Sequence, residues 1–187
     1  MPPLLPAMAQ GTVQPPAVPA PEQKLQEETA QLLDRLFAQL HKADNEKTAQ
    51  AIEKAIWGLW AKSGSSTADA LLQQASRAMS ASAYPVALRI LDTIIEVKPD
   101  FAEAWNKRAT LYYLERKFDR SLSDIDVVLD LEPRHFGALS GLGMIRRELG
   151  DDKAALDAYR RALVIHPFQQ GARRAVKELE SEFEQKI

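Results

Sequence analysis

The sequence predicts an all-α fold, in which antiparallel helix pairs stack into a right-handed superhelix that ends in a C-terminal capping helix. Pro99, Pro133 and Pro167 follow one another at intervals of 34 residues, a fixed period that indicates a repeat architecture. Between these prolines, apolar residues recur at helical spacing, as at Leu122, Ile125 and Leu129. Each such helix has an apolar face that it cannot bury alone, so neighbouring helices must stack.

Composition excludes several kinds of site. With 0 Cys, the 187-residue chain has no disulfide framework, thiolate zinc site, iron–sulfur cluster or cysteine nucleophile. The formal net charge of −2 gives no basic surface of the kind that binds nucleic acid. No stretch approaches the roughly eighteen apolar residues that a membrane-spanning helix needs, and the longest candidate runs only from Ala55 to Ala61. The sequence therefore predicts neither nucleic-acid binding nor membrane insertion.

Residues 1–21 form a proline-rich segment that we expect to be disordered or extended. They hold 7 of the 11 prolines, which fix φ and remove backbone donors. Within them, Ala7-Met8-Ala9 ends an apolar stretch in the small-residue pattern of a signal peptidase site. The basic region and the longer apolar core of a complete signal are absent from this stretch. Two interpretations stay open: the remainder of a secretion signal, or an ordinary tail.

Residues 22–67 are predicted to form a helical hairpin, with helices at about 23–41 and 45–62. Trp57 and Trp60 lie three positions apart on the second helix, and we interpret them as core residues rather than a ligand cage. The same apolar pair is the first candidate surface for a homo-oligomer, because uncapped ends of a helical stack can join two copies.

Three repeat units follow, at 68–101, 102–135 and 136–169. Large residues and small residues recur in phase, as expected where helices pack closely in every unit. The matching columns hold Leu71, Trp105 and Leu139; Ala75, Ala109 and Gly143; Ala87, Ser121 and Ala155; Leu91, Ile125 and Tyr159; and Ile94, Val128 and Ala162.

Helix ends are marked by single residues. Asp100 and Glu103 have the spacing of a capping box at a helix start. Gly150 is placed to end a helix in the left-handed conformation, and Arg116 in the same column must bear strain or adopt another turn. The last segment, 170–187, is the expected capping helix, charged on one face. Its apolar stripe consists of Ala172, Val176, Leu179 and Phe183.

The third unit has the clearest motif. It carries Gly143, Ala155, Tyr159 and Pro167 in phase with a known repeat. In these columns the chain resembles the tetratricopeptide repeat (TPR) family, and the resemblance covers all three units. It implies that residues 22–67 are a divergent TPR-like hairpin. It also implies a protein that binds a protein or peptide, without enzymatic activity and without a cofactor.

In the resembling family, the first helix of each pair lines a concave groove whose outward columns meet a partner. Mapped here, those columns give a mixed patch that is neither strongly basic nor purely apolar. Asn106 can bond a peptide backbone in both senses, and Lys107 can pair with a carboxylate, as can Arg147. Tyr113 and Met144 offer adaptable contact area. The predicted partner-binding residues are Gln73, Ser76, Asn106, Lys107, Thr110, Tyr113, Met144 and Arg147.

One use of this fold is not predicted. Chaperone-binding TPR domains that resemble this chain hold two carboxylates with Lys, Asn and Arg side chains. The corresponding columns here include Leu72 and Ser76, and the bases of the third unit are replaced by Gly137 and Gly141. We expect these two glycines to leave space for a partner's backbone instead.

The sequence shows no catalytic or metal-binding motif, whether a phosphate-binding glycine loop, a nucleophile elbow or a paired-histidine zinc motif. His135 and His166 stand in turns beside repeat prolines, where we expect polar surface residues. Asp124, Asp126 and Asp130 lie within a predicted helix, which scatters them around its axis and excludes a calcium loop. The sequence therefore predicts that the protein is not an enzyme.

The repeat array, the Ala7-Met8-Ala9 pattern and the proline-rich segment together favour a non-enzymatic periplasmic scaffold that binds another envelope protein. The chain resembles small periplasmic bacterial TPR proteins, and this resemblance alone implies a role in cell-envelope integrity. The alternative is a cytoplasmic TPR adaptor or chaperone for secretion substrates or regulators.

Overall fold

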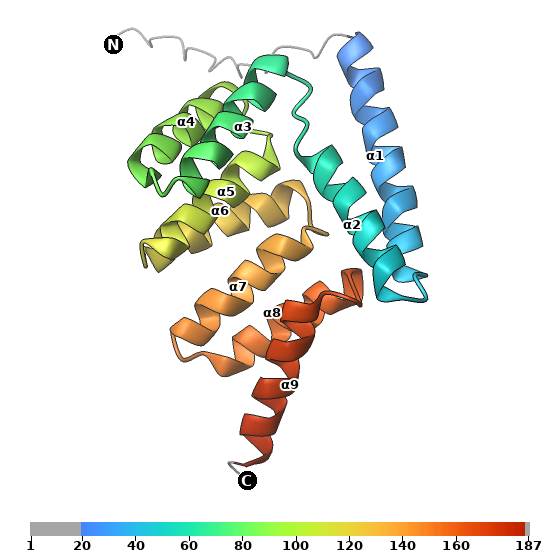
Figure 1. Cartoon of the computed structure of the whole chain (residues 1–187), viewed down its shortest axis with the longest axis vertical. Coiled ribbons are helices and arrows are strands. Elements are labelled where there is room, and N and C mark those ends of the chain that lie inside the picture. The colour runs from blue at the N-terminus through green and yellow to red at the C-terminus, as the bar shows by residue number, and fades with distance from the viewer. Residues whose placement is uncertain (1–19, 186–187) are drawn as a thin grey trace, which may run out of the picture.

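The computed structural model describes residues 20–185, with side chains from Lys24 onward, and this part of the chain consists of nine α-helices and their turns. From α1 the chain runs to a stack of helix pairs and then down to α9 at its far end (Figure 1). In chain order the helices are α1 (Ala20–His41), α2 (Glu46–Trp60), α3 (Ser66–Ser80), α4 (Tyr84–Val97), α5 (Ala102–Leu114), α6 (Phe118–Leu131), α7 (Phe136–Glu148), α8 (Asp152–Ile165) and α9 (Gln170–Glu184).

Side chains cap several helix starts. The side chain of Asn45 accepts the backbone N–H three residues later at 2.9 Å, and that of Asp151 does the same at 3.1 Å. Pro85 sits in the first turn of α4, where its missing N–H is not needed. A proline is tolerated in the first turn of α1 for the same reason. Ala20 and Pro21 already belong to α1, so the prediction that residues up to 21 are non-helical was wrong for these two residues.

The capping box expected at Asp100 and Glu103 does not form. Helix α5 begins after Phe101, and no side chain caps it. Glu103 is only 4% exposed, because its carboxylate turns into the protein and finds partners there instead of at the helix end.

The turns inside the three helix pairs share one backbone conformation. Ser82, Arg116 and Gly150, spaced by 34 residues, have φ of 57°, 57° and 77°. In each turn the next N–H bonds a carbonyl five residues earlier, at 2.8 to 2.9 Å. The left-handed conformation predicted for Gly150 is confirmed. Ser82 and Arg116 adopt it at a steric cost of about 1–2 kcal/mol each, which a Cβ brings to this region.

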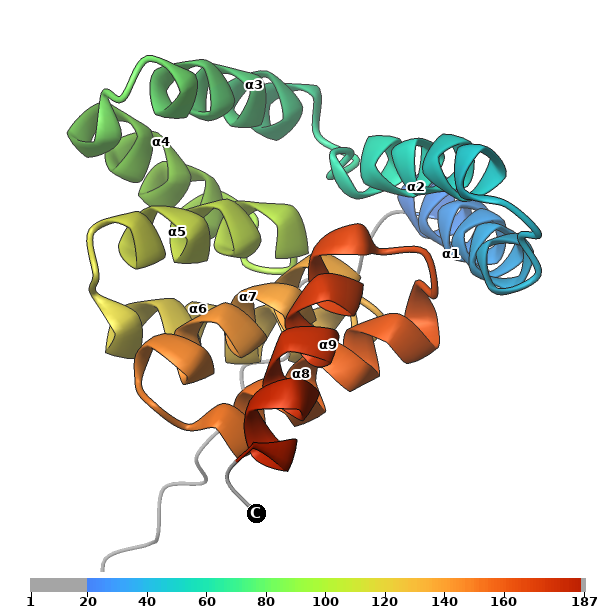
Figure 2. The ribbon, with the colours of Figure 1, turned by 60° about the horizontal axis from the view of Figure 1, so that its bottom comes forward.

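The pairs α3–α4, α5–α6 and α7–α8 pack one on the next as a right-handed superhelix, and α9 packs on α8 (Figure 2). Apolar clusters fill the space between successive pairs: Leu91 and Ile94 pack with Phe101 at the start of α5. At the far end, α9 contributes Ala172 and Leu179 to the last cluster. The predicted all-α fold is therefore confirmed, with α9 in the capping position.

The N-terminal hairpin α1–α2 does not continue this stack. Its apolar side chains, including Leu40 and Ile56, form a separate cluster with Phe136 at the start of α7, against which Phe168 also packs. Helix α1 also contacts α8. In Figure 2 the hairpin lies on the side of the molecule away from α4 and α6. The hairpin α1–α2 thus packs on the last helix pair, α7–α8, and does not stack on α3, the helix that follows it in the chain.

The hairpin covers two histidines that were expected at the surface. His135 and His166 are 0% and 1% exposed, so that expectation was wrong. Trp60 stacks on the His135 ring with centroids 4.1 Å apart and an angle of 8°. The turn beside a repeat proline faces solvent in an isolated stack, but here α2 lies over it. Trp60 is a core residue, as predicted, and Trp57 is partly buried against the same cluster, so much of the surface considered for self-association is occupied within one chain.

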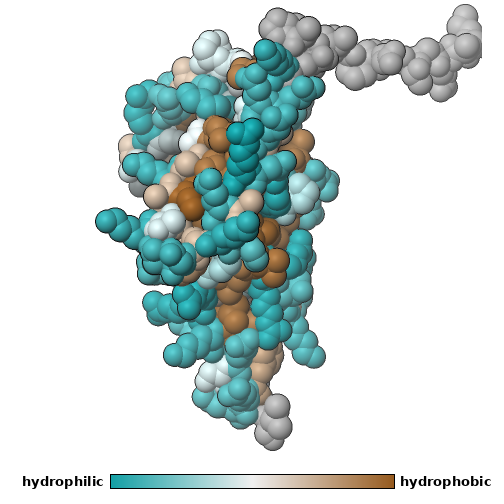
Figure 3. All heavy atoms as spheres, turned by 90° about the vertical axis from the view of Figure 1, so that its right-hand side faces the viewer, coloured by the Kyte–Doolittle hydropathy of each residue, from teal (hydrophilic) through white to brown (hydrophobic). Residues whose placement is uncertain are grey.

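The outward face of α1 is mostly hydrophilic, as the view in Figure 3 shows, although Leu25 and Leu32 remain 52% and 43% exposed. Within residues 20–185, no helix is both long enough and apolar enough to cross a membrane. The Ala7-Met8-Ala9 pattern lies outside the residues that the structure describes.

Candidate partner-binding groove

Three hollows follow the first helices of the pairs. We name them the hairpin hollow, of about 640 Å³ between α2, α3 and α5; the central hollow, of about 260 Å³ between α5 and α7; and the end hollow, of about 370 Å³ beside α5, α7 and α8. All eight predicted partner-binding residues line one of them: Gln73, Ser76 and Lys107 the hairpin hollow; Asn106 and Thr110 the central hollow; Tyr113 and Met144 the central and end hollows; and Arg147 the end hollow.

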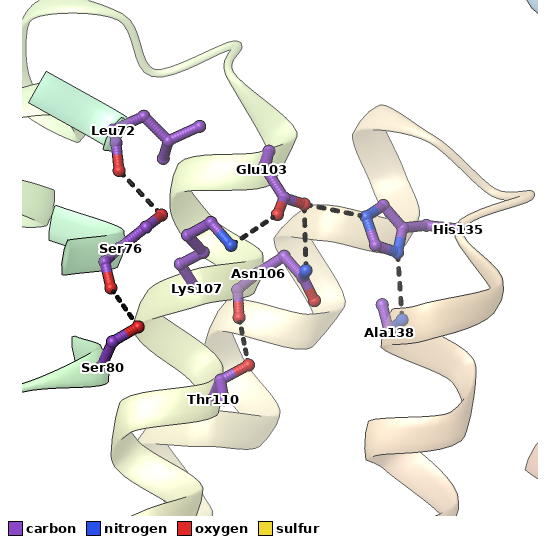
Figure 4. Close-up of polar contacts among 9 residues, drawn as sticks. All are labelled: Leu72, Ser76, Ser80, Glu103, Asn106, Lys107, Thr110, His135 and Ala138. Carbon is purple, nitrogen blue, oxygen red and sulfur yellow. Dashed lines mark hydrogen bonds and ion pairs between the residues drawn. The ribbon is translucent and has the colours of Figure 1, made fainter. Parts of the chain in front are cut away.

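A buried carboxylate organises the floor of this groove. The Oε1 atom of Glu103 lies 3.2 Å from Lys107 Nζ, and its Oε2 accepts a hydrogen bond from Asn106 Nδ2 at 3.0 Å. From the residue before α7, the Nε2 atom of His135 lies 3.4 Å from the same Oε2 (Figure 4). Lys107 and Asn106 therefore already have partners within the chain, which hold both side chains in place beside the hollows.

The same contacts orient the His135 ring and lower the pKa of Glu103. The Nδ1 atom of His135 accepts the N–H of Ala138 at 3.0 Å at the start of α7, so the ring hydrogen is on Nε2 and points toward Glu103. Burial by itself raises the pKa of Glu103. The hydrogen bond from His135 and the charge of Lys107 outweigh burial, so this pKa lies below its ordinary value of 4.5. Glu103 therefore stays charged inside the groove floor.

A second carboxylate holds α2 over the last helix pair. The Nε2 atom of His166 lies 3.1 Å from Glu53 Oε2, and Trp57 Nε1 donates to the other oxygen at 3.3 Å. The hydrogen bond from His166 lowers the pKa of Glu53 more than its partial burial raises it. Glu53 is thus an anionic contact between the hairpin and the end of α8.

We expect the protein to lose stability in acid through Glu103 and Glu53. Both have a lower pKa folded than unfolded, so their contribution is complete above the ordinary value of 4.5 and disappears as the pH falls through the folded-state pKa. Urea unfolding at several pH values should give a weaker dependence on pH in Glu103→Gln than in the parent. The matched control, Glu96→Gln, changes an exposed carboxylate of α4 and should keep the parental slope; equal slopes in all three proteins would contradict the assignment.

Arg147 has carboxylate partners in its own chain. Its guanidinium lies 3.1 Å from Glu178 and 2.8 Å from Glu182, both on α9. The capping helix therefore satisfies the positive charge at this end of the groove. The repeat period predicted the position of Arg147 but gave no sign of these acids, because α9 lies outside the repeat.

The space expected beside Gly137 is filled by the chain itself. A Cβ built on Gly137 would lie 2.7 Å from Trp57 Cη2, so the absence of a side chain admits the indole of α2, and the expected approach of a partner's backbone is wrong at this position. Beside Gly141, the nearest atom to such a Cβ is Ile125 Cδ1 at 3.6 Å. Gly141 lines the central hollow, where its surface stays available.

Sequence reasoning missed part of the hairpin hollow. Trp57 lines it from α2, Ala61 and Lys62 from the two residues after α2, and Arg77 from α3. The first three lie outside the repeat period, and Arg77 lies outside the groove columns of the resembling family. No signal in the sequence could have placed these side chains together.

Comparison with known proteins decides the family. A tetratricopeptide repeat model matches residues 72–131 and 108–170. A TPR repeat-containing protein of Rhizobium etli is 43% identical over 149 residues, which cover 80% of this chain and 73% of that protein. The chain belongs to the tetratricopeptide repeat family. Its fold is therefore one that serves as a scaffold for interactions between proteins.

Solved TPR structures share the fold at low identity. The first TPR domain of Spaghetti (RPAP3), bound to an HSP90 peptide, has a TM-score of 0.60 and 20% identity and covers 63% of this chain and 93% of its own. The Sgt2 TPR domain from Aspergillus fumigatus has a TM-score of 0.61 and 19% identity, with 65% and 82% covered. Each match therefore leaves about a third of this chain without a counterpart.

Proposed function

We propose that this TPR protein is a non-enzymatic scaffold whose groove binds a segment of another protein. The observation that carries the proposal is the line of three hollows along α3, α5 and α7, bordered by all eight side chains that the family resemblance selects. The peptide bound to the RPAP3 domain supports a segment, rather than a whole folded surface, as the occupant. Tyr113 and Met144 border two hollows each and form the centre of the proposed interface.

We place this scaffold in the periplasm, where it would bind another envelope protein and support cell-envelope integrity. The support is the Ala7-Met8-Ala9 pattern, which follows an apolar stretch as a signal peptidase site does. The alternative is a cytoplasmic adaptor or chaperone for secretion substrates or regulators. The HSP90 peptide in the RPAP3 structure is the observation that favours it.

The groove is tested by removing its central contact area. Tyr113→Ala combined with Met144→Ala should reduce capture of the partner from envelope fractions, while circular dichroism stays helical because Met144 is 42% exposed and Tyr113 is only partly buried. The control combines Val97→Ala with Val164→Ala, which shortens two apolar side chains that are 67% and 71% exposed on α4 and α8 and that line none of the three hollows. Quantitative mass spectrometry of captured proteins compares the two. Equal recovery by both variants would place the interface elsewhere.

The location is tested separately. The full genomic reading frame, including the codons upstream of Met1, is fused to a reporter that is active only after export. The periplasmic proposal expects reporter activity, and expects that Ala7→Asp together with Ala9→Asp abolishes processing at the small-residue site. An inactive reporter in cells that contain the fusion protein would favour the cytoplasmic alternative.

A further inference from the structure

We propose that the hairpin hollow binds an acidic segment of the partner protein that carries an apolar side chain between its acids. The inference rests on the proposed function, because it names the chemistry of the partner at one part of the same groove. It depends on the N-terminal hairpin, which supplies one wall of this hollow.

The floor of the hairpin hollow is apolar. Trp57 and Ala61 from the hairpin face Leu72 from α3 across it, and Leu72 is 3% exposed. The hollow holds about 640 Å³, room for a large apolar side chain and the backbone beside it. Such a pocket favours one apolar anchor, since burial of its area drives binding.

The rim of the hollow is positive. Lys62, Arg77 and Lys107 line it, and the acid among the lining residues, Glu103, is already held by Lys107 and its neighbours. Arg77 is exposed and forms no ion pair with any residue between Lys24 and Gln185. These charges attract carboxylates that flank the apolar anchor.

Lys62 is only loosely engaged. It lies 3.7 Å from Asp69, whose carboxylate is held more closely by the N–H and the hydroxyl of Ser63, each at 2.7 Å. The Lys62 side chain is 62% exposed, so it can turn toward an incoming acid without exposing a buried charge.

Gln73 supplies a contact for the backbone of the segment. It is exposed at the hollow, and its amide makes no hydrogen bond with the rest of the described chain. An amide offers both a donor and an acceptor, which fits the N–H and C=O of an extended peptide. The contacts proposed for the acidic side chains and the apolar side chain of the segment do not require the C-terminal carboxylate of the partner. An internal segment of the partner therefore fits this site.

The test uses a labelled synthetic peptide, acetylated and amidated, in which acidic residues flank a central Leu–Phe pair. Fluorescence anisotropy should detect binding that weakens as NaCl is added, because the rim charges are exposed. A peptide with Lys in place of the acids, and one with Gly–Ser in place of Leu–Phe, should each bind at least about tenfold more weakly. Equal binding by either comparison peptide, or no binding by the acidic one, would overturn the proposal.

Protein variants locate the peptide. Arg77→Glu and Lys62→Glu should each weaken binding about tenfold, because each converts an attraction into a repulsion. Arg89→Glu makes the same charge change at an exposed position of α4 outside the hollow and should leave binding within about twofold. Binding that is unchanged in Arg77→Glu and Lys62→Glu would also overturn the proposal.

Capture of the natural partner separates this inference from the proposed function. Loss of capture by the Tyr113 and Met144 variant with full capture by Arg77→Glu would leave the groove as the interface and reject the acidic anchor. Loss of capture by both the Tyr113 and Met144 variant and Arg77→Glu supports the groove as the interface and the acidic segment as its occupant. Full capture by both variants rejects both proposals.

Discussion

Arg108→Ala is expected to lower the free energy of unfolding by about 3–5 kcal/mol. The guanidinium of Arg108 binds Asp124 of α6 through two hydrogen bonds of 2.8 Å each, and Asp92 of α4 through one of 2.7 Å. Asp124 is only 4% exposed, so removing Arg108 leaves a buried carboxylate with no countercharge. The hydrogen bond with Asp124 raises the pKa of Arg108 despite partial burial.

The two partners of Arg108 provide the controls. Asp92→Asn should cost at most about 1 kcal/mol, because that carboxylate is half exposed and water can replace its contact. Arg108→Met combined with Asp124→Leu removes both buried charges and should recover much of the loss. Urea unfolding followed by far-ultraviolet circular dichroism gives all three values. If Arg108→Ala lowers the free energy of unfolding no more than Asp92→Asn does, Asp124 does not need Arg108 as its countercharge, and the prediction is wrong.

Trp60→Ala is expected to cost about 3–5 kcal/mol and to release the hairpin from the repeats. The centroid of the Trp60 ring lies 4.1 Å from the ring centroid of His135, 5.1 Å from that of Phe136 and 5.9 Å from that of Phe37. It is 7% exposed and joins α1, α2 and α7 in one cluster. Its loss opens a cavity between the hairpin and the superhelix.

The matched control is Trp60→Phe. It keeps an aromatic ring in the cluster and removes the indole Nε1, a buried atom with no hydrogen-bond partner among the described residues, so it should cost less than about 1.5 kcal/mol. Hydrogen exchange resolves where the effect lies. In Trp60→Ala, amides of α1 and α2 should lose protection while those of α5 and α6 keep most of theirs. Uniform loss across all helices would contradict a separable hairpin.

The groove could be predicted in part because its residues are periodic. The positions of Asn106, Thr110, Tyr113 and Met144 follow from their columns in a repeat of 34 residues. Their partners do not. Glu103 has the spacing of a helix cap, but it turned inward because His135 and Lys107 lie close enough to hold its charge in the interior.

Three of the wrong predictions share one cause. His135, His166 and Gly137 were assigned from their places in a solvent-exposed turn or groove, and all three lie under α2. Contacts between Trp57 and Gly137, or between Glu53 and His166, join residues about 80 and 113 positions apart in the chain. Local propensity and periodicity carry no information about contacts of that separation.

The sequence by itself determined the helices, their pairing and the family. Proline spacing sets where each pair ends, and amphipathic faces require that neighbours stack, which are local and periodic constraints. Only the tertiary structure decided where the hairpin α1–α2 lies, because its apolar face could have stacked on α3 or on the far end of the chain. The aromatic start of α7, with Phe136 and the ring of His135, matches the two tryptophans and fixes that choice. The hairpin hollow exists because of it.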